Sequence, residues 1–336
     1  MRALVTGGAG FLGSHFVREW IGAGRGELLN VDLLTYAGSL QRLQEVAADP
    51  RYRHIRADVA DRQAVVDVCR EFHPEVVVHF AAESHVTRSE RDPDRFWTTN
   101  AEGTRTMLEA AAASGVSRFV HVSTDEVYGP RPAGRFREQD KLPGDGQATS
   151  PYAKSKAVAD DLARGFAGGL EVVVVRPTNC FGSWQYPEKA FARWVVRALT
   201  DQPLLVWGDG RYVRQWLHAG DLTKAIMLVL DAEGPEPVYN VGPRHSPEVR
   251  NRDLAGWLLA YLDLPPNRLV FTDYDRPDHD ERYAVDPTRI EALGWKPADV
   301  WSRFAETVEW YRATPDWWTP LVREAESIYA DQGGTR

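Results

Sequence analysis

The chain has 336 residues, of which 43% are hydrophobic and 26% charged, so it is long enough for one large globular domain or two moderate ones. The net charge of −8 argues against a broad nucleic-acid-binding surface, which is basic, although a small anionic ligand needs only a local cluster of Arg and Lys. The sequence has only two cysteines, Cys69 and Cys180, scattered histidines and no apolar run of about 18 residues, so we expect no disulfide framework, metal site or membrane span.

The first half of the chain alternates short apolar strands with helical patterns. A strand begins at once, and a glycine-rich turn follows where a signal peptide would have its apolar core, so we expect a cytoplasmic protein. Nearly continuous apolar strands predict an α/β fold, a Rossmann-type doubly wound parallel sheet with helices on both faces. Strands are expected at 3–6, 27–32, 52–58, 75–80, 117–123 and 172–176, and helices at 14–23, 62–71, 95–114 and 151–167.

The pattern changes after about residue 177, where strands become shorter and Pro and Trp more frequent. We therefore expect a dinucleotide-binding domain at 1–176, to which about 212–236 returns. A smaller, mixed α/β substrate-binding domain is expected to take up most of 177–330. Residues 130–149 are rich in Pro, Gly and charge, which is typical of a surface loop over a site.

A dinucleotide site is predicted by Gly7, Gly10 and Gly13, which lie between the first strand and the first helix. Such a turn needs residues without Cβ, lets a pyrophosphate approach the backbone and points a helix N-terminus at the anion. Asp32 ends the next strand 19 residues after Gly13, where a carboxylate accepts ribose hydroxyls and repels a 2′-phosphate, which favours NAD over NADP. Asp58, after the third strand, is expected to face the adenine. The alternative is that the glycines are simple turn residues and Asp32 caps a helix.

Tyr152 and Lys156 form a Y-x-x-x-K pair on the helix expected at 151–167. Residues four apart share one helix face, so the phenol and the ammonium can converge on one point. The ammonium is expected to lower the pKa of the tyrosine toward the range of a general base. Taken alone, the pair reads more simply as a surface tyrosine and a solvated lysine. Its place after the glycine motif favours catalysis.

Thr124, Asp125 and Glu126 follow the strand expected at 117–123. In doubly wound sheets, ligands bind beyond the carboxyl ends of the strands. Two adjacent carboxyl groups in a partly dry cleft titrate as a coupled pair in which one tends to hold its proton. Elimination of water requires one acid and one base. The alternative is a helix N-cap followed by acidic first-turn residues.

These motifs resemble the extended short-chain dehydrogenase/reductases that act on nucleotide sugars, through TGGAGFLG (6–13), the Y-x-x-x-K pair and the Ser-Thr strand end. Within that group the chain is similar to the dTDP-glucose 4,6-dehydratases, over nearly its whole length. The most specific segments are STDEVYG (123–129) and DRPDHDERYAVD (275–286). Further similar segments are VDLLTYAGSL (31–40), AAESHVTRS (81–89), PEKAF (187–191), GDGRYVRQWLHAGD (208–221), YNVG (239–242), GWKP (294–297) and WYRATPDWWTPL (310–321).

The resemblance implies NAD-mediated oxidation at C4 of the sugar, elimination of water across C5 and C6, and return of the hydride to C6. The product would be dTDP-4-keto-6-deoxy-glucose. In this reaction Tyr152 would take the proton of the 4-hydroxyl, with Lys156 supporting the phenolate and Thr124 hydrogen-bonded near O4. Glu126 would remove the C5 proton while Asp125 protonates the departing 6-hydroxyl.

The resemblance also implies which side chains line each part of the site. The expected NAD contacts are Gly7, Gly10, Phe11, Leu12, Gly13, Asp32, Asp58, Val59, Ala81, Thr99, Tyr152 and Lys156. The expected contacts with the dTDP-hexose are Ser84, Asn179, Lys189, Arg214, Asn251, Arg276 and His279. The family commonly has Asp where Thr87 stands and a second Asn where Cys180 stands, which puts details of nucleotide and sugar recognition in question.

Two other functions fit parts of the same pattern. A nucleotide-sugar 4-epimerase or decarboxylase would use only the Tyr/Lys pair and NAD and would leave Asp125 and Glu126 idle. A non-catalytic NAD-binding regulatory protein would keep the fold but has no use for these four side chains. The family resemblance further implies a homodimer, formed through the helices at 95–114 and 151–167, which are rich in alanine on one face.

Overall fold

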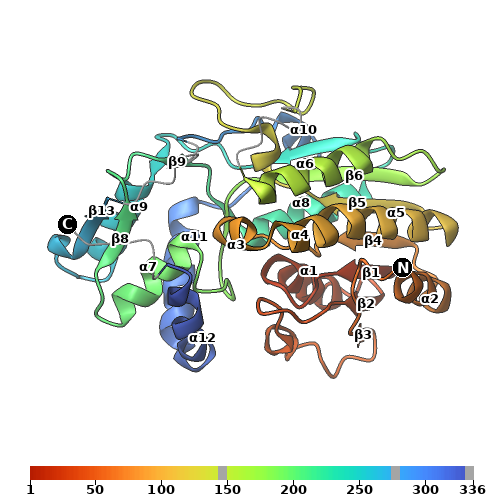
Figure 1. Ribbon diagram of the computed structural model, residues 1–336, viewed down its shortest axis with the longest axis horizontal. Coiled ribbons are helices and arrows are strands. Elements are labelled where there is room, and N and C mark those ends of the chain that lie inside the picture. The colour runs from red at the N-terminus through yellow and green to blue at the C-terminus, as the bar shows by residue number, and fades with distance from the viewer. Residues whose placement is uncertain (143–149, 274–280, 330–336) are drawn as a thin grey trace.

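The computed structural model describes residues 1–142, 150–273 and 281–329, which form a larger and a smaller lobe (Figure 1). Arg276 and His279, two of the expected substrate contacts, lie outside the described residues, as does part of the loop expected at 130–149. No helix within the described ranges combines the length and apolar character that a membrane crossing requires.

A seven-stranded sheet forms the centre of the larger lobe, in the order β11-β6-β5-β4-β1-β2-β3. All neighbouring strands are parallel, as predicted. The chain winds outward from β1 in both directions, and such a reversal is where doubly wound sheets bind ligands. The strands are β1 (Arg2–Thr6), β2 (Glu27–Val31), β3 (Tyr52–Ile55), β4 (Val76–His79), β5 (Arg118–Val122), β6 (Glu171–Pro177) and β11 (Val238–Val241).

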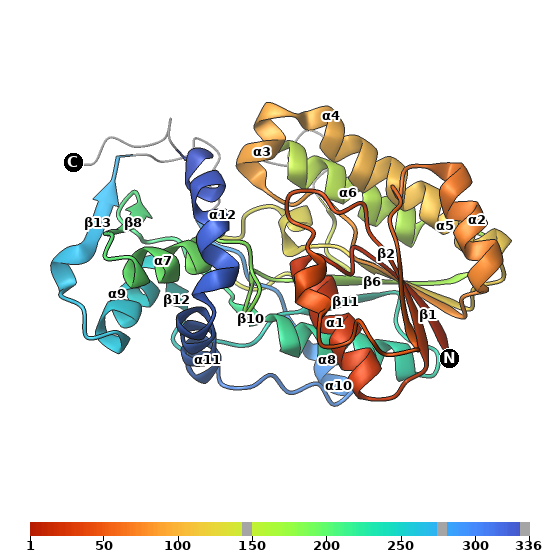
Figure 2. The same cartoon turned by 90° about the horizontal axis from the view of Figure 1, so that it is seen from below.

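Helices cover both faces of this sheet, as Figure 2 shows. Side chains alternate along a strand, so Val5 and Val78 pack in one layer while Leu4 and Val77 pack in the other. The first layer contains α1 (Phe11–Gly22), α8 (Ala219–Asp231) and α10 (Thr288–Ala292). The second layer contains α2 (Arg62–Phe72), α5 (Gly103–Ala113) and α6 (Pro151–Arg164).

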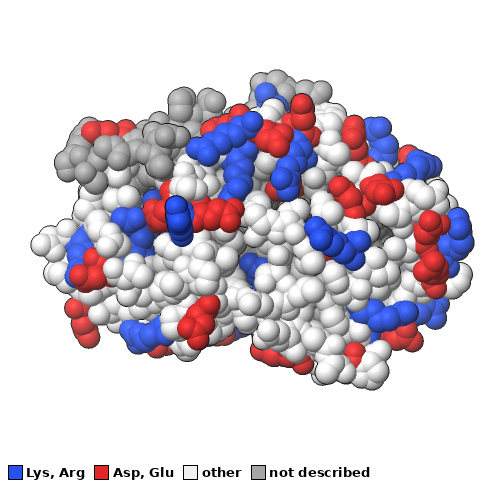
Figure 3. Space-filling view, turned by 60° about the horizontal axis from the view of Figure 1, so that its bottom comes forward, with Lys and Arg blue, Asp and Glu red and all other residues white. Residues whose placement is uncertain are grey.

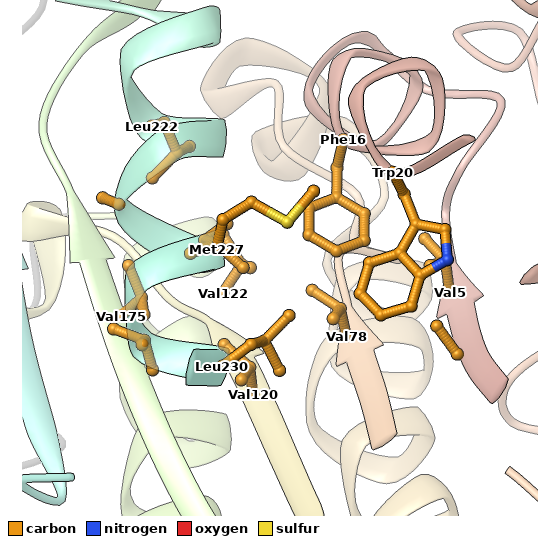
Figure 4. Packing of buried hydrophobic residues seen from close by; sticks show 14 of the residues in the cluster. Val5, Phe16, Trp20, Val78, Val120, Val122, Val175, Leu222, Met227 and Leu230 are labelled. Atoms are coloured by element: carbon orange, nitrogen blue, oxygen red, sulfur yellow. The ribbon is translucent and has the colours of Figure 1, made fainter. Parts of the chain in front are cut away.

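The first layer is anchored by two aromatic side chains of α1, Phe16 and Trp20 (Figure 4). They are four residues apart and therefore share one helix face, with ring centroids 5.7 Å apart and no solvent exposure. Met227 of α8 belongs to the same buried cluster and points toward Phe16. This packing fixes the start of α1, and with it the turn that joins β1 to α1.

The helix expected at 95–114 is interrupted. It consists of α4 (Pro93–Phe96), a π-helical segment η2 (Trp97–Glu102) and α5, and α3 (Val86–Arg91) precedes it. Within η2 the side chain of Asn100 binds groups outside the helix, and the carbonyl of Asn100 accepts from Thr104 Oγ1 at 2.6 Å. Such wide turns are frequent near functional sites because they redirect side chains.

The smaller lobe has its own buried core, in which Phe181, Phe191 and Trp216 surround Phe304. Its helices are α7 (Ala190–Leu199), α9 (Asn251–Tyr261), α11 (Val300–Ala313) and α12 (Pro315–Ser327). Its short strands are β7 (Cys180–Phe181), β8 (Leu204–Trp207), β9 (Val213–Arg214), β10 (Leu217–His218), β12 (Val249–Arg250) and β13 (Leu269–Thr272).

Short 3-10 segments are η1 (Leu40–Leu43), η3 (Asp125–Tyr128) and η4 (Pro266–Arg268). The chain returns to the larger lobe through α8 and also through β11, which lies just beyond the returning segment expected at 212–236.

Candidate active site

A cavity of about 570 Å³ lies where the carboxyl ends of the central strands meet the smaller lobe. The residue after each of four strands lines it, namely Gly7 after β1, Asp32 after β2, Phe80 after β4 and Ser123 after β5. Its volume is that of a typical ligand-binding cavity. The segment from Thr178 to Lys189 contributes the wall on the side of the smaller lobe.

The turn between β1 and α1 has no room for side chains at its glycines. Gly7 has a positive φ of 69°, and a Cβ there would lie 2.7 Å from the backbone nitrogen of Ala81. A Cβ on Gly13 would lie 2.2 Å from the carbonyl oxygen of Gly7. The turn therefore brings bare backbone to the cavity at the N-terminus of α1, which suits a diphosphate. This crowding explains why Gly7 and Gly13 are glycines, whether the turn binds a cofactor or only joins β1 to α1.

Asp32 is held in place by two backbone N–H groups. Its Oδ2 accepts from Ala9 N at 2.9 Å and its Oδ1 from Leu34 N at 2.8 Å. Burial raises the pKa of this carboxyl, and the two N–H groups oppose that shift. Asp32 lines the cavity beyond the glycine turn and follows a strand, so it is not a helix cap. A fixed carboxylate here suits the hydroxyls of a ribose.

The remaining expected cofactor contacts also line this cavity. Asp58 Oδ1 accepts from Ala60 N at 2.9 Å, which closes the turn after β3. Val59 is buried against Gly103, where a Cβ would lie 2.8 Å from its methyl group. The other lining residues from the expected set are Phe11, Leu12, Ala81 and Thr99. The cavity thus combines a turn of bare backbone at a helix N-terminus, a fixed carboxylate and apolar walls, and these groups fit a dinucleotide.

Thr124, Asp125 and Glu126 meet the cavity from the end of β5. Thr124 caps η3, because its Oγ1 accepts from Glu126 N at 3.3 Å. Asp125 is 2% exposed, and its Oδ2 has no hydrogen-bond partner among the described residues. Burial, followed by the charge of Glu126, raises the pKa of Asp125 to about 8. Asp125 therefore keeps its proton at neutral pH.

Tyr152 and Lys156 line the same cavity from the first turns of α6, and both are buried. The helix begins at Pro151 with Ser150 as its cap, since Ser150 Oγ accepts from Ala153 N at 3.1 Å. Lys156 Nζ donates to the carbonyl oxygen of Val122 at 2.8 Å, and burial lowers its pKa to about 8. Burial and the charge of Glu126 raise the pKa of Tyr152. The expectation that the ammonium lowers the pKa of the tyrosine is wrong for this structure, because desolvation of the phenol dominates.

Asn100 fixes α6 against the cavity wall. Its Nδ2 donates to Ser155 Oγ at 2.9 Å and to the carbonyl of Glu83 at 3.0 Å, while its Oδ1 accepts from Glu83 N at 2.9 Å. On the other side of α6, Asp160 accepts from Ser123 Oγ at 2.7 Å and pairs with buried Arg176. These contacts set the position of the helix that carries Tyr152.

The expected substrate contacts divide into two groups. Ser84, Asn179 and Lys189 line the cavity; Lys189 Nζ donates to the carbonyl of Ser84 at 2.7 Å, and Asn179 Oδ1 is buried without a partner among the described residues. Arg214 and Asn251 lie outside this lining. Arg214 is on β9, with its guanidinium 5.1 Å from the Tyr283 ring centroid, and Asn251 begins α9 directly after β12. The charge of Arg214 lowers the pKa of Asp125, against the larger effects of burial and of Glu126.

Known proteins similar to this chain share its length as well as its fold. A "Probable dTDP-glucose 4,6-dehydratase" of Sinorhizobium fredii is 42% identical, with 96% of this chain and 95% of that protein aligned. The dTDP-glucose 4,6-dehydratase of Streptomyces niveus is 41% identical over 97% of each. The crystal structure of DesIV, a dTDP-glucose 4,6-dehydratase from Streptomyces venezuelae with NAD and TYD bound, matches 96% of this chain and 100% of its own, with a TM-score of 0.89 and 41% identity.

Residues 3–242 match the model of the NAD dependent epimerase/dehydratase family. The chain belongs to this family and, within it, to the dTDP-glucose 4,6-dehydratases. The matched range includes the glycine turn, Asp32 and all five expected catalytic residues. Membership confirms the Rossmann-type fold and an NAD-dependent dehydratase as the class of enzyme.

Several charged cavity residues of this family member were not singled out from the sequence. Glu83 pairs with Arg95 at 2.8 Å, Tyr36 donates to Glu188 Oε1 at 2.8 Å, and Arg42 lies 2% exposed beside the glycine turn. These residues sit in loops and short helices without periodic pattern, so their meeting depends on tertiary structure. The one usable signal was position, since Tyr36 lies in VDLLTYAGSL and Glu188 in PEKAF, both segments that resemble the family.

Proposed function

We propose that this protein is a dTDP-glucose 4,6-dehydratase that keeps NAD bound and forms dTDP-4-keto-6-deoxy-glucose. The observation that carries the proposal is that Asp125 and Glu126 share one cavity with the Tyr152/Lys156 pair and the glycine turn. A 4-epimerase or decarboxylase has no use for the acid–base couple, and a non-catalytic NAD-binding protein has no use for either pair.

NAD, when bound along the glycine turn and Asp32, would supply oxidation at C4 of the sugar and reduction at C6. The side chains manage the protons. The phenol of Tyr152 is neutral at rest because burial raises its pKa, so its proton must pass to solvent before the phenolate can take the proton of the 4-hydroxyl. Lys156, one helical turn away with its ammonium on Val122 O, would stabilise the resulting charge.

The carboxyl pair would carry out the elimination. The new ketone acidifies the C5 proton, which Glu126 would remove and would give back to C5 when the hydride returns to C6. Asp125 would give its proton to the 6-hydroxyl, which leaves as water; it holds that proton at neutral pH because its pKa is about 8. Lys189 and Arg214 are cations at this side of the smaller lobe and would suit the diphosphate.

Incubation of the purified protein with dTDP-glucose, UDP-glucose or GDP-mannose, followed by mass analysis, tests the proposal. We expect loss of one water from dTDP-glucose and a product with strong alkaline absorbance. A product of unchanged mass would indicate an epimerase, and no turnover with retained NAD would indicate a binding protein.

We further propose a cytoplasmic homodimer that pairs through η2, α5 and α6. Trp97 of η2 is 45% exposed on this face, and Cys69 and Cys180 are both free thiols, which suits a reducing compartment. On the face shown in Figure 3, Lys and Arg are interspersed with Asp and Glu, so charge alone marks no partner there. Analytical ultracentrifugation of Trp97→Glu against wild type tests the pairing, since a monomeric wild type would refute it.

A further inference from the structure

Arg42 occupies a junction between the glycine turn and the smaller lobe. Arg42 is 2% exposed and is among the residues that line the cavity. Its Nη1 donates to the carbonyl oxygen of Ala9 at 3.0 Å and to that of Ala37 at 2.6 Å. Its Nε donates to the carbonyl of Trp184 at 3.0 Å, and its Cζ lies 5.4 Å from the ring centroid of Trp317 in α12.

The contact with Ala9 reaches the part of the turn that would face the cofactor. The N–H of Ala9 donates to Asp32 Oδ2, and its carbonyl accepts from both Arg42 and Ser39 N, the latter at 2.9 Å. The N–H of Ala9 is therefore held by the carboxylate of Asp32, and its carbonyl group is held by the guanidinium of Arg42. A shift of Arg42 would move the turn and Asp32 together.

The contact with Ala37 holds the segment that follows Asp32. Gly38 packs so close that a Cβ there would lie 3.0 Å from Asp32 Oδ1. The positive charge of Arg42 also favours the ionised form of Asp32, against the effect of burial on its pKa. An Arg near this carboxylate could in principle bind a 2′-phosphate. Here Nη1 and Nε already donate to three carbonyl groups, which favours a supporting role.

We propose that Arg42 is a positioning residue for NAD, which locks the glycine turn and Asp32 in the geometry that holds the adenosine ribose and ties that geometry to the smaller lobe through Trp184 and Trp317. The inference rests on the proposed use of NAD by this protein. It assigns to Arg42 tight retention of the cofactor, without direct participation in the proton transfers.

The test measures NAD binding by isothermal titration on protein freed of nucleotide, for wild type, Arg42→Met, Arg42→Lys and Arg18→Met. Arg18 is the matched control: it lies at the same junction of lobes, with its Cζ 5.7 Å from the Trp184 ring centroid, and it does not line the cavity. Because charge-assisted hydrogen bonds in a buried site are at stake, we expect the Kd for NAD to rise about 10- to 100-fold in Arg42→Met.

Arg42→Lys keeps the charge, but a single ammonium cannot donate to all three carbonyl groups that Nη1 and Nε reach. Its Kd for NAD is therefore expected to lie between those of wild type and Arg42→Met. Arg18→Met is expected to bind NAD as wild type does. At saturating NAD, kcat of the Arg42 variants should approach the wild-type value, which a misfolded site would not allow. The affinity for NADP should stay weak throughout.

Unchanged NAD affinity in Arg42→Met would overturn the inference, as would an equal loss in Arg18→Met. If Arg42→Met does not fold, Arg42→Lys provides the test. Wild-type affinity for NAD in Arg42→Lys would show that the hydrogen bonds of the guanidinium do not support NAD binding, and would overturn the inference. A wild-type protein that binds no NAD would instead refute the proposed function.

Discussion

Asp125 and Glu126 are neighbours at the end of β5, and the charge of Glu126 adds to burial in raising the pKa of Asp125 to about 8. Asp125 can act as a general acid only while protonated. We therefore expect kcat to fall as the pH rises through about 8, and we expect Asp125→Asn to lose dehydration at every pH. The test is kcat measured as a function of pH with saturating dTDP-glucose. If kcat stays constant well above pH about 8, Asp125 is not the general acid.

Replacing Glu126 by Gln separates oxidation from elimination. The variant keeps the Tyr152/Lys156 pair but loses the base for the C5 proton. Dehydration should fall about 10²- to 10⁴-fold, the usual contribution of a positioned acid or base. Oxidation at C4 should persist, seen as near-ultraviolet absorbance of reduced nicotinamide after substrate is added. Glu109→Gln, on the exposed face of α5, is the matched control. Normal dehydration by Glu126→Gln would contradict the assignment.

Tyr152→Phe removes the phenol that would take the proton of the 4-hydroxyl. Both oxidation and dehydration should fall about 10²- to 10⁴-fold, while the affinity for NAD stays close to wild type. Tyr261→Phe, whose hydroxyl binds Glu309 on the surface, controls for loss of a hydroxyl alone. Rapid-quench detection of any 4-keto sugar and NAD titration give the two readouts. Undiminished oxidation by Tyr152→Phe would remove it from the mechanism.

The sequence predicted the sheet well because parallel strands buried on both faces have unmistakable apolar runs, such as Val76–His79. It also predicted that Tyr152 and Lys156 would share a face, since that follows from helix geometry. The π-helical turn at Trp97–Glu102 was missed; Asn100 within it makes hydrogen bonds to Ser155 and Glu83, contacts that spacing along the chain does not report. The direction of the pKa shift of Tyr152 was missed for a similar reason, since burial cannot be read from spacing.

Contacts between segments distant in the chain were equally hidden. Arg42 lies in an unremarkable stretch of sequence, and its carbonyl partners Ala9 and Trp184 carry no side-chain signal at all. Which backbone carbonyl groups accept these hydrogen bonds depends on which loops pack together. The periodicity of hydrophobic residues along the sequence carries no information about that packing. The roles of Arg276 and His279 remain predictions from resemblance alone, because both lie outside the described residues.

Lys156 illustrates a conflict between stability and catalysis. Burial lowers its pKa from 10.5 to about 8, so the folded state disfavours the charged form. The free-energy cost of burying the ammonium is fully present below pH about 8. It disappears as the pH rises toward 10.5, the pKa of Lys156 in the unfolded chain. Lys156→Met removes the charge while it keeps an apolar stem of similar length. We therefore expect it to increase the free energy of unfolding by roughly 1–3 kcal/mol at neutral pH.

The same variant should lose most activity, because no ammonium would then stabilise the phenolate of Tyr152. Chemical denaturation of wild type and Lys156→Met at neutral and alkaline pH measures the free energy of unfolding of each. The difference between the two proteins is expected to become smaller as the pH rises. Lys154→Met, an exposed position on the same helix, should change neither stability nor its pH dependence. If Lys156→Met were less stable at neutral pH, the hydrogen bond from Nζ to Val122 O would outweigh the desolvation of the ammonium, and this lysine would be structural as well as catalytic.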